Sequence, residues 1–151
     1  MIELRAATES DISGILDIVE EADNESFFKG DYDRWTASYY IQNFIDDDHS
    51  VIMLATKNGE IMGAVIMAAS WEFWKKPIAY VVKFWIKVAG RRTRAARLLV
   101  GYIEQFAREH ECTDVYATAT AELDEKEQRL FENLFYKNGF SNVGATMRKG
   151  F

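Results

Sequence analysis

The chain has almost no cysteine and almost no proline. Its 151 residues contain one cysteine, Cys112, and one proline, Pro77. A single cysteine cannot form a disulfide within the chain, which is typical of proteins in a reducing compartment. Cys112 precedes a predicted strand, so we interpret it as a core or strand-edge thiol rather than a nucleophile. Because 48% of the residues are apolar and 14% are aromatic, we expect one packed domain over residues 1–151 and no disorder.

Long apolar runs are also absent. Charged residues interrupt each apolar stretch well short of the roughly 18 residues that a membrane span needs, and residues 1–5 do not have the pattern of a signal peptide. We therefore expect a soluble, cytoplasmic protein. Basic residues number 18 and acidic residues 24, which gives a formal net charge of −6. This balance disfavours nonspecific binding to nucleic acid or to membranes.

The charge is unevenly distributed along the chain. Four arginines fall within residues 91–97, whereas six acidic residues gather in one early segment: Glu20, Glu21, Asp23, Glu25, Asp31 and Asp33. An acidic protein with a local basic segment suits one small anionic ligand better than a polyanion.

The hydrophobic pattern predicts a mixed α/β fold in the order β-α-α-β-β-β-α-β-α-β-β. Asn58-Gly59 is a strong hairpin signal between two β-prone runs, and residues 80–88 carry apolar side chains in both alternating sets, as a central strand does. The predicted helices cover residues 8–22, 35–46, 93–107 and 124–138. The predicted strands cover residues 2–5, 51–57, 60–69, 79–88, 114–120, 140–143 and 145–151.

A basic turn follows the predicted central strand. Residues 90–97 read Gly-Arg-Arg-Thr-Arg-Ala-Ala-Arg and lead into a long amphipathic helix. The first amides of a helix lack partners within it and attract anions, so this turn favours phosphate binding. Four arginines at a helix N-terminus also oppose the helix dipole, and a bound anion would relieve that conflict. The alternative is an exposed helix face whose arginines pair with Glu104 or Glu109.

This turn resembles the signature Arg/Gln-x-x-Gly-x-Gly/Ala of the GNAT family of N-acetyltransferases. Here it reads Arg91-x-x-Arg94-x-Ala96, with arginine in place of the central glycine, and such variants resemble acetyltransferases encoded by tailed bacteriophages. Residues 2–7 and residues 134–140 are similar to other parts of the family pattern. The resemblance implies the acyl-CoA N-acyltransferase fold, a central splayed mixed sheet, and acetyl-coenzyme A as cosubstrate.

The resemblance also implies a cofactor site on this strand and turn. In the family the backbone of one central strand binds the pantetheine arm, and by register those groups lie at Ile86 and Val88. A glutamine on the following helix, Gln128, stands where the family often has an asparagine that contacts the cofactor; an exposed helix glutamine is an equal alternative. The pyrophosphate would lie on residues of the turn: Arg91, Arg92, Thr93, Arg94, Ala95 and Ala96.

The acid and base of the reaction are less evident. The family base is often a glutamate on the central strand, but residues 77–88 hold no carboxylate and Lys83 occupies that neighbourhood; the nearest candidates are Glu72 and the early acidic segment. The family acid is commonly a tyrosine at the position of Phe135. Tyr136 follows one residue later, a rotation of about 100° on a helix, and we name it the candidate acid. Transfer by proximity alone is the alternative.

The expected reaction is direct transfer to a primary amine in a ternary complex, the amine being a protein lysine or N-terminus, a polyamine or another small amine. Acidic and aromatic residues near the expected acceptor site suit a cationic amine. The aromatic residues have an equal alternative, burial under loops or a homodimer interface: Phe27, Phe28, Tyr32, Trp35, Trp71, Phe73 and Trp74. Tyr80 and Tyr116 are weaker candidates for the acid than Tyr136, and we interpret both as core. We expect no metal site. The alternative function is a catalytically weak binding module that contacts a partner protein.

Overall fold

The computed structural model describes residues 1–25, 31–118, 125–145, 147 and 149–151. The predicted acceptor-site residues Phe27 and Phe28 lie outside these described residues. So do the last two residues of the strand predicted over 114–120 and the first residue of the helix predicted over 124–138.

A five-stranded mixed sheet forms the centre of the described structure. Its strand order is β1-β2-β3-β4-β5; the first four strands are antiparallel to their neighbours, and β5 is parallel to β4. The predicted mixed α/β class is therefore confirmed. The elements are β1 (Ile2–Ala6), the 3₁₀ helix η1 (Glu9–Asp11), α1 (Ile12–Glu25), α2 (Arg34–Asp46), β2 (Ser50–Lys57), β3 (Glu60–Ser70), β4 (Ile78–Ile86), the 3₁₀ helix η2 (Val88–Gly90), α3 (Ala95–Glu109), β5 (Val115–Ala117) and α4 (Glu125–Lys137).

Local chemistry explains where several elements begin and end. The Asp33 carboxylate accepts a hydrogen bond from the Thr36 amide at 2.8 Å and so caps the N-terminus of α2. Asn58 and Gly59 both have positive φ angles, 51° and 80°, as a tight hairpin turn requires. The predicted hairpin between β2 and β3 is confirmed.

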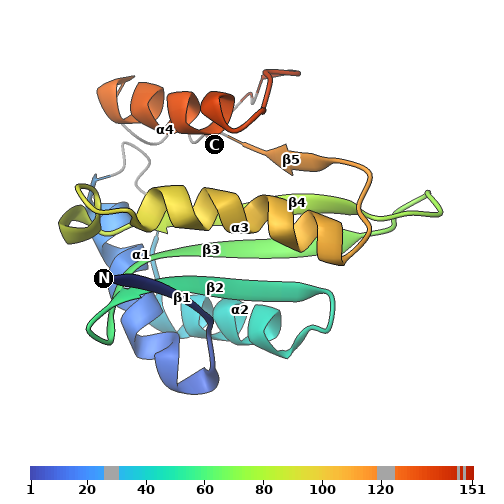
Figure 1. Cartoon of the computed structure of the whole chain (residues 1–151). Coiled ribbons are helices and arrows are strands. Elements are labelled where there is room, and N and C mark those ends of the chain that lie inside the picture. Colours follow the sequence, from blue (N-terminus) through green and yellow to red (C-terminus); the bar gives the residue numbers. More distant parts are fainter. Residues whose placement is uncertain (26–30, 119–124, 146, 148) are drawn as a thin grey trace.

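Two hydrophobic cores lie on opposite faces of the sheet. On one face, α3 and Phe135 of α4 pack against residues such as Val65 and Met67. On the other face, α1 and α2 pack against Ile52, Leu54 and their neighbours. Figure 1 shows this arrangement, with α3 crossing in front of the sheet, α1 and α2 behind it, and α4 beside β5. Because α3 connects β4 to the parallel β5, it crosses one face and brings its N-terminus to the end of β4.

The structure corrects the predicted C-terminal strands. Residues 140–145, 147 and 149–151 form no strand, so the two closing strands predicted over 140–143 and 145–151 are wrong for these described residues. The short run of 140–143 and the exposed Val143 and Met147 offer little apolar surface for a sheet to bury. None of the described helices is long and apolar enough to cross a membrane.

Candidate active site

The most distinctive feature of the sheet is an opening between β4 and β5. The two strands pair only from Ala79 to Val81 on β4, and the rest of β4 has no partner on that side among the described residues. Val82 is an extra residue relative to β3, because Val81 lies opposite Met67 and Lys83 opposite Ile66. A β-bulge bends its strand and increases the local twist. The bulge thus coincides with the point at which β5 separates from β4.

The bulge also corrects the predicted alternation of this strand. Val81, Phe84 and Ile86 pack with the core on the α3 face, whereas Val82 and Trp85 pack with the core on the α1 face. An unbroken alternation would place Val82 on the same face as Phe84. A β-bulge places two consecutive residues of a strand on the same face and so shifts the alternation of all residues after it.

The open edge of β4 carries unpaired backbone groups. The Lys87 amide donates to the Met62 carbonyl of β3 at 2.9 Å, and hydrogen-bonding direction alternates along an antiparallel strand. Phe84 and Ile86 therefore direct their backbone N–H and C=O groups toward the opening. Beyond the strand end, the Val88 carbonyl accepts a hydrogen bond from the Arg91 amide within the turn. The Val88 amide lies 3.3 Å from a carboxylate oxygen of Glu21 on α1. This edge has the form that an added extended chain needs for pairing.

A tight turn joins β4 to α3 at the end of the opening. The 3₁₀ helix η2 packs against β3 so closely that a Cβ on Gly90 would lie 2.5 Å from the Met62 carbonyl oxygen. The Thr93 hydroxyl donates to the Gly90 carbonyl at 2.6 Å and accepts from the Ala95 amide at 3.2 Å. Glycine at position 90 and threonine at position 93 therefore fix the path of the turn.

The N-terminus of α3 has the donors that an anion requires. The Leu98 amide is bonded to the Arg94 carbonyl, so the amides of Ala96 and Arg97 in the first turn are left for other acceptors. Arg91, Arg92, Arg94 and Arg97 all have exposed side chains. Arg94 has φ −79° and ψ 1°, which an arginine adopts without strain, so this backbone does not require the family glycine. Exposed guanidinium groups beside free helix amides fit a pyrophosphate.

The arginines do not form the helix-face pairs that were the alternative. Glu104 pairs with Arg108, and the Glu109 carboxylate accepts from Gln105. Arg91 instead pairs with Glu25 of α1. Sequence reasoning missed the role of Glu21 and Glu25, although their spacing of four residues on one helix was a signal that both reach the same surface.

The α4 helix presents an apolar side chain to the opening. Phe135 is buried, 5% exposed, and its ring centroid lies 5.6 Å from that of Phe84, with Phe131 and Phe140 also in contact. Tyr136 is 45% exposed and lines a separate pocket between α4, β5 and residues 140–145, together with Gln128. Gln128 donates to Glu132 one turn along the same helix. Phe131 and Phe135 are the α4 side chains whose rings contact Phe84 of β4, and Tyr136 is not among them.

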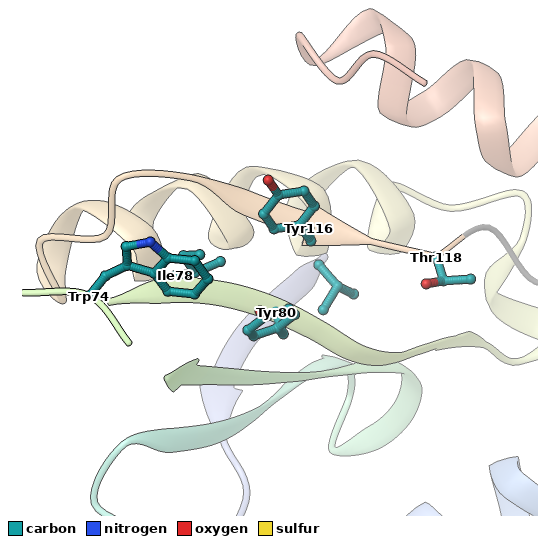
Figure 2. A pocket seen from close by; sticks show the side chains of 6 residues that line it. Trp74, Ile78, Tyr80, Tyr116 and Thr118 are labelled. Carbon is teal, nitrogen blue, oxygen red and sulfur yellow. The ribbon is translucent and has the colours of Figure 1, made fainter. Parts of the chain in front are cut away.

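A second pocket, of about 370 Å³, lies along the paired part of β4 and β5. Figure 2 shows Trp74 at one end, Thr118 at the other, and Tyr80 and Tyr116 between them. The two tyrosine rings are stacked, with centroids 6.1 Å apart. Because Ala79 and Ala117 pack with the α3 core, their neighbours Tyr80 and Tyr116 project from the opposite face. The interpretation of these tyrosines as core was wrong, since Tyr116 is 45% exposed and both line the pocket.

Glu72 is attached to this pocket through Tyr80. The Tyr80 hydroxyl donates a hydrogen bond of 2.6 Å to a Glu72 carboxylate oxygen. That bond, together with partial burial, raises the pKa of Tyr80 above its usual value, so the phenol remains protonated at neutral pH. Glu72 has a φ angle of 46°, an uncommon conformation for a non-glycine residue that often marks functional sites.

The remaining aromatic and acidic candidates are dispersed. Trp35 is 80% exposed and Phe73 94% exposed, whereas Trp71 packs edge-on against His49. In the acidic segment, Glu20 pairs with Arg34 and accepts a hydrogen bond from Tyr32. The structure therefore brings Trp74 and Glu72 to the pocket but leaves Trp35 and Phe73 at the surface.

Comparisons with known proteins agree with this geometry. Residues 15–135 match the family model described as the acetyltransferase (GNAT) family. A comparison with curated protein sequences finds no match.

Solved structures of similar fold cover nearly the whole chain. A predicted acetyltransferase with acetyl-CoA from Clostridium acetobutylicum has a TM-score of 0.78 at 16% identity, covering 99% of this chain and 96% of that one. Ribosomal-protein-alanine N-acetyltransferase from Brucella melitensis has a TM-score of 0.77 at 14% identity, covering 99% of both chains. Glucosamine-6-phosphate N-acetyltransferase from Arabidopsis thaliana has a TM-score of 0.75 at 15% identity, covering 100% of this chain and 99% of that one. With the family model matching four-fifths of its length, the chain belongs to the acetyltransferase (GNAT) family, whose members are N-acetyltransferases that use acetyl-coenzyme A.

Proposed function

We propose that the chain acts as one domain that transfers the acetyl group of acetyl-coenzyme A directly to a primary amine. The observation that carries this proposal is the opening of β4 at Val82, which ends in the basic turn at the N-terminus of α3. An open strand edge and an anion-binding turn in series match a ligand with an amide-containing arm and a pyrophosphate.

In this proposal the two parts of the site divide the binding of the cosubstrate. Arg91, Arg92 and Arg94, with the first amides of α3, neutralise the pyrophosphate. Ile86 and Val88 bind the two pantetheine amides through their backbone, as an added strand. Thr93, Ala95 and Ala96 shape the turn, and Gln128 borders the site from α4.

The acceptor amine is proposed to bind in the pocket formed by Trp74, Tyr80 and Tyr116, on the face of the sheet opposite to α3. The amine must be neutral to attack, and Glu72 is the carboxylate at this pocket that receives its proton, through the hydroxyl of Tyr80. Aromatic rings and a carboxylate suit a cationic group. Similar structures have acceptors as different as a ribosomal protein and glucosamine 6-phosphate, and both are amines.

Calorimetry tests the cosubstrate site. Acetyl-coenzyme A is expected to bind the protein, and the double variant Arg91→Glu/Arg92→Glu is expected to weaken binding by at least about 30-fold, since two charge-assisted contacts become repulsive. Arg108→Glu, which reverses a charge on the same helix away from the turn, is the control. Absence of binding to the wild-type protein would refute the function, whereas unchanged binding by the double variant would refute only the site.

The alternative function, a binding module with weak chemistry, is favoured by one observation. Phe135 and the phenylalanines around it provide no proton donor beside β4. Thiol release from acetyl-coenzyme A, measured with a panel of amines and peptides, separates the two functions. Turnover that depends on the amine and falls with Glu72→Gln supports the enzyme; binding of a partner protein with no turnover supports the module.

A further inference from the structure

Lys83 is a charged residue at the point where the sheet opens. It follows the bulge residue Val82 directly and lies opposite Ile66 of β3. Directly opposite residues project from the same face of a sheet, and Ile66 belongs to the core on the α1 face. Lys83 therefore projects from the same face as Tyr80 and the acceptor pocket, while its neighbour Phe84 faces α4.

This lysine is exposed and has no ion-pair partner among the described residues. The contrast is Lys87, four residues later on the same segment, whose ammonium pairs with Glu60 at 2.9 Å. The pairing favours the charged form of Lys87 and raises its pKa. Among the residues that the structure describes, no such ion pair holds the amine of Lys83 in place.

The length of the pantetheine arm connects Lys83 to the proposed function. Between its phosphate and its sulfur the arm has a main chain equivalent to about four residues of extended polypeptide. An arm that begins at the turn beside Val88 and runs back along the open edge of β4 therefore ends near Phe84 and Lys83. The thioester would lie at the bulge, within reach of the flexible side chain of Lys83.

We infer that Lys83 is a site of self-acetylation: in the absence of an amine acceptor, its ε-amine takes the acetyl group from acetyl-coenzyme A bound to the same chain. This inference rests on the proposed function, because it requires the thioester at the opening of β4. The ammonium first loses a proton to solvent. The amine nitrogen then attacks the thioester carbonyl, a C–N bond forms, the C–S bond breaks, and the departing thiolate takes up a proton. The products are N-acetyllysine and coenzyme A.

Self-acetylation would change the acceptor face. It removes one positive charge and one nucleophile beside the pocket, so an acetylated chain presents Glu72 without the opposing charge of Lys83. A cationic acceptor would then approach a face with one positive charge fewer, so the electrostatic repulsion of the acceptor would be smaller.

Peptide mass spectrometry after incubation with acetyl-coenzyme A alone tests the inference. Lys83 is expected to be acetylated at least about 100-fold faster than the exposed Lys57, because the reaction within one complex gains from proximity. The rate constant is expected to be independent of protein concentration. Lys83→Arg, which keeps the charge, removes the fast release of thiol, whereas the control Lys57→Arg retains it.

Two results would overturn the inference. One is acetylation of Lys83 at the rate of Lys57; the other is a rate that rises with protein concentration, which indicates transfer between molecules. Calorimetry and amine-dependent turnover on the same samples test the self-acetylation and the proposed function separately. Binding and turnover without modification of Lys83 remove only the self-acetylation, while absence of binding and of turnover removes the proposed function and the self-acetylation with it.

Discussion

Glu25, at the end of α1, accepts a hydrogen bond from the guanidinium of Arg91, in the turn before α3. One turn earlier on α1, the Glu21 carboxylate approaches the Val88 amide. Two carboxylates from α1 thus contact donors that the proposed function assigns to the cosubstrate. In the proposed function, the pyrophosphate competes with Glu25 for the charge of Arg91, and the pantetheine arm competes with Glu21 for the Val88 amide.

Glu25→Gln is therefore expected to tighten the binding of coenzyme A. Both partners are about one-third exposed, and a pair of this kind contributes only about 0.2–1 kcal/mol, so the expected gain is about 1.4- to fivefold in Kd. Calorimetry at low salt measures it, and Glu104→Gln, which breaks the pair with Arg108, is the matched control. Weaker binding by Glu25→Gln would mean that Glu25 positions Arg91 for the ligand rather than competing with it.

Gly90→Ala is expected to lower the free energy of unfolding by about 1–3 kcal/mol, the usual cost of forcing atoms into a packed site. The added Cβ would lie 2.5 Å from the Met62 carbonyl oxygen, and backbone must move to relieve this contact. Gly101→Ala in α3 is the control, because a Cβ there meets nothing within 4 Å; it is expected to stabilise the helix by about 0.5–1 kcal/mol. Urea unfolding of both variants measures these changes. Equal changes in the free energy of unfolding would contradict the close approach at Gly90.

Phe135→Tyr is expected to raise kcat by about tenfold or more, since it places a proton donor on a buried α4 side chain that contacts Phe84, and general acids contribute about 10²–10⁴-fold. The measurement is the pH profile of amine-dependent thiol release. Tyr136→Phe tests the predicted role of Tyr136 in the same assay. A loss of kcat in Tyr136→Phe, with no gain in Phe135→Tyr, would assign the acid to Tyr136.

The ion pair between Asp11 and Arg5 is expected to make stability depend on pH. Hydrogen bonds from Arg5 lower the pKa of Asp11 from 3.8 to about 2. The folded pKa lies below the unfolded one, so the stabilisation is complete above about pH 4 and is lost as the pH falls toward 2. Because Arg5 is half-exposed, we expect only about 1 kcal/mol.

Asp11→Asn is the variant that measures this contribution. Its free energy of unfolding is expected to be about 1 kcal/mol below that of the wild type at pH 7, and the difference is expected to shrink as the pH falls through about 2, the pKa of Asp11 in the folded protein. Glu9→Gln, in the same short helix η1, is the control without such a pair. A difference that stays constant from pH 7 to pH 2 would show that Asp11 acts through helix capping rather than through its charge.

Local signals in the sequence were sufficient to predict the elements whose ends are set by residues within or next to them. Asn58-Gly59 specified the hairpin, and the amphipathic run after Thr93 specified α3 as observed from Ala95. The pairing of Arg91 with Glu25 was not predictable in the same way, because it joins residues 66 positions apart. Distant partners depend on how helices are placed around the sheet, which no local pattern encodes.

The two errors on β4 and β5 have a common physical cause. A strand with apolar side chains on both faces predicts burial on both, but the helices α1 and α2 leave Tyr80 and Tyr116 uncovered, so these residues line a pocket instead. The bulge at Val82 is equally impossible to predict from the strand sequence, because an apolar residue is compatible with either face. In both cases the strand sequence alone does not record what covers each face of the strand.

The bulge at Val82 divides β4 into two halves that are out of phase. Before it, the odd-numbered Ala79 and Val81 face α3; after it, the even-numbered Phe84 and Ile86 do. Removal of Val82 itself would restore one continuous phase and leave Lys83 and the later residues opposite their present β3 partners. Removal of one residue after the bulge would instead send every later side chain of the strand to the wrong layer. We therefore expect evolutionary change in length to be tolerated in the loops of this protein but not between Lys83 and Ile86, where one residue more or fewer exchanges the two faces of the strand.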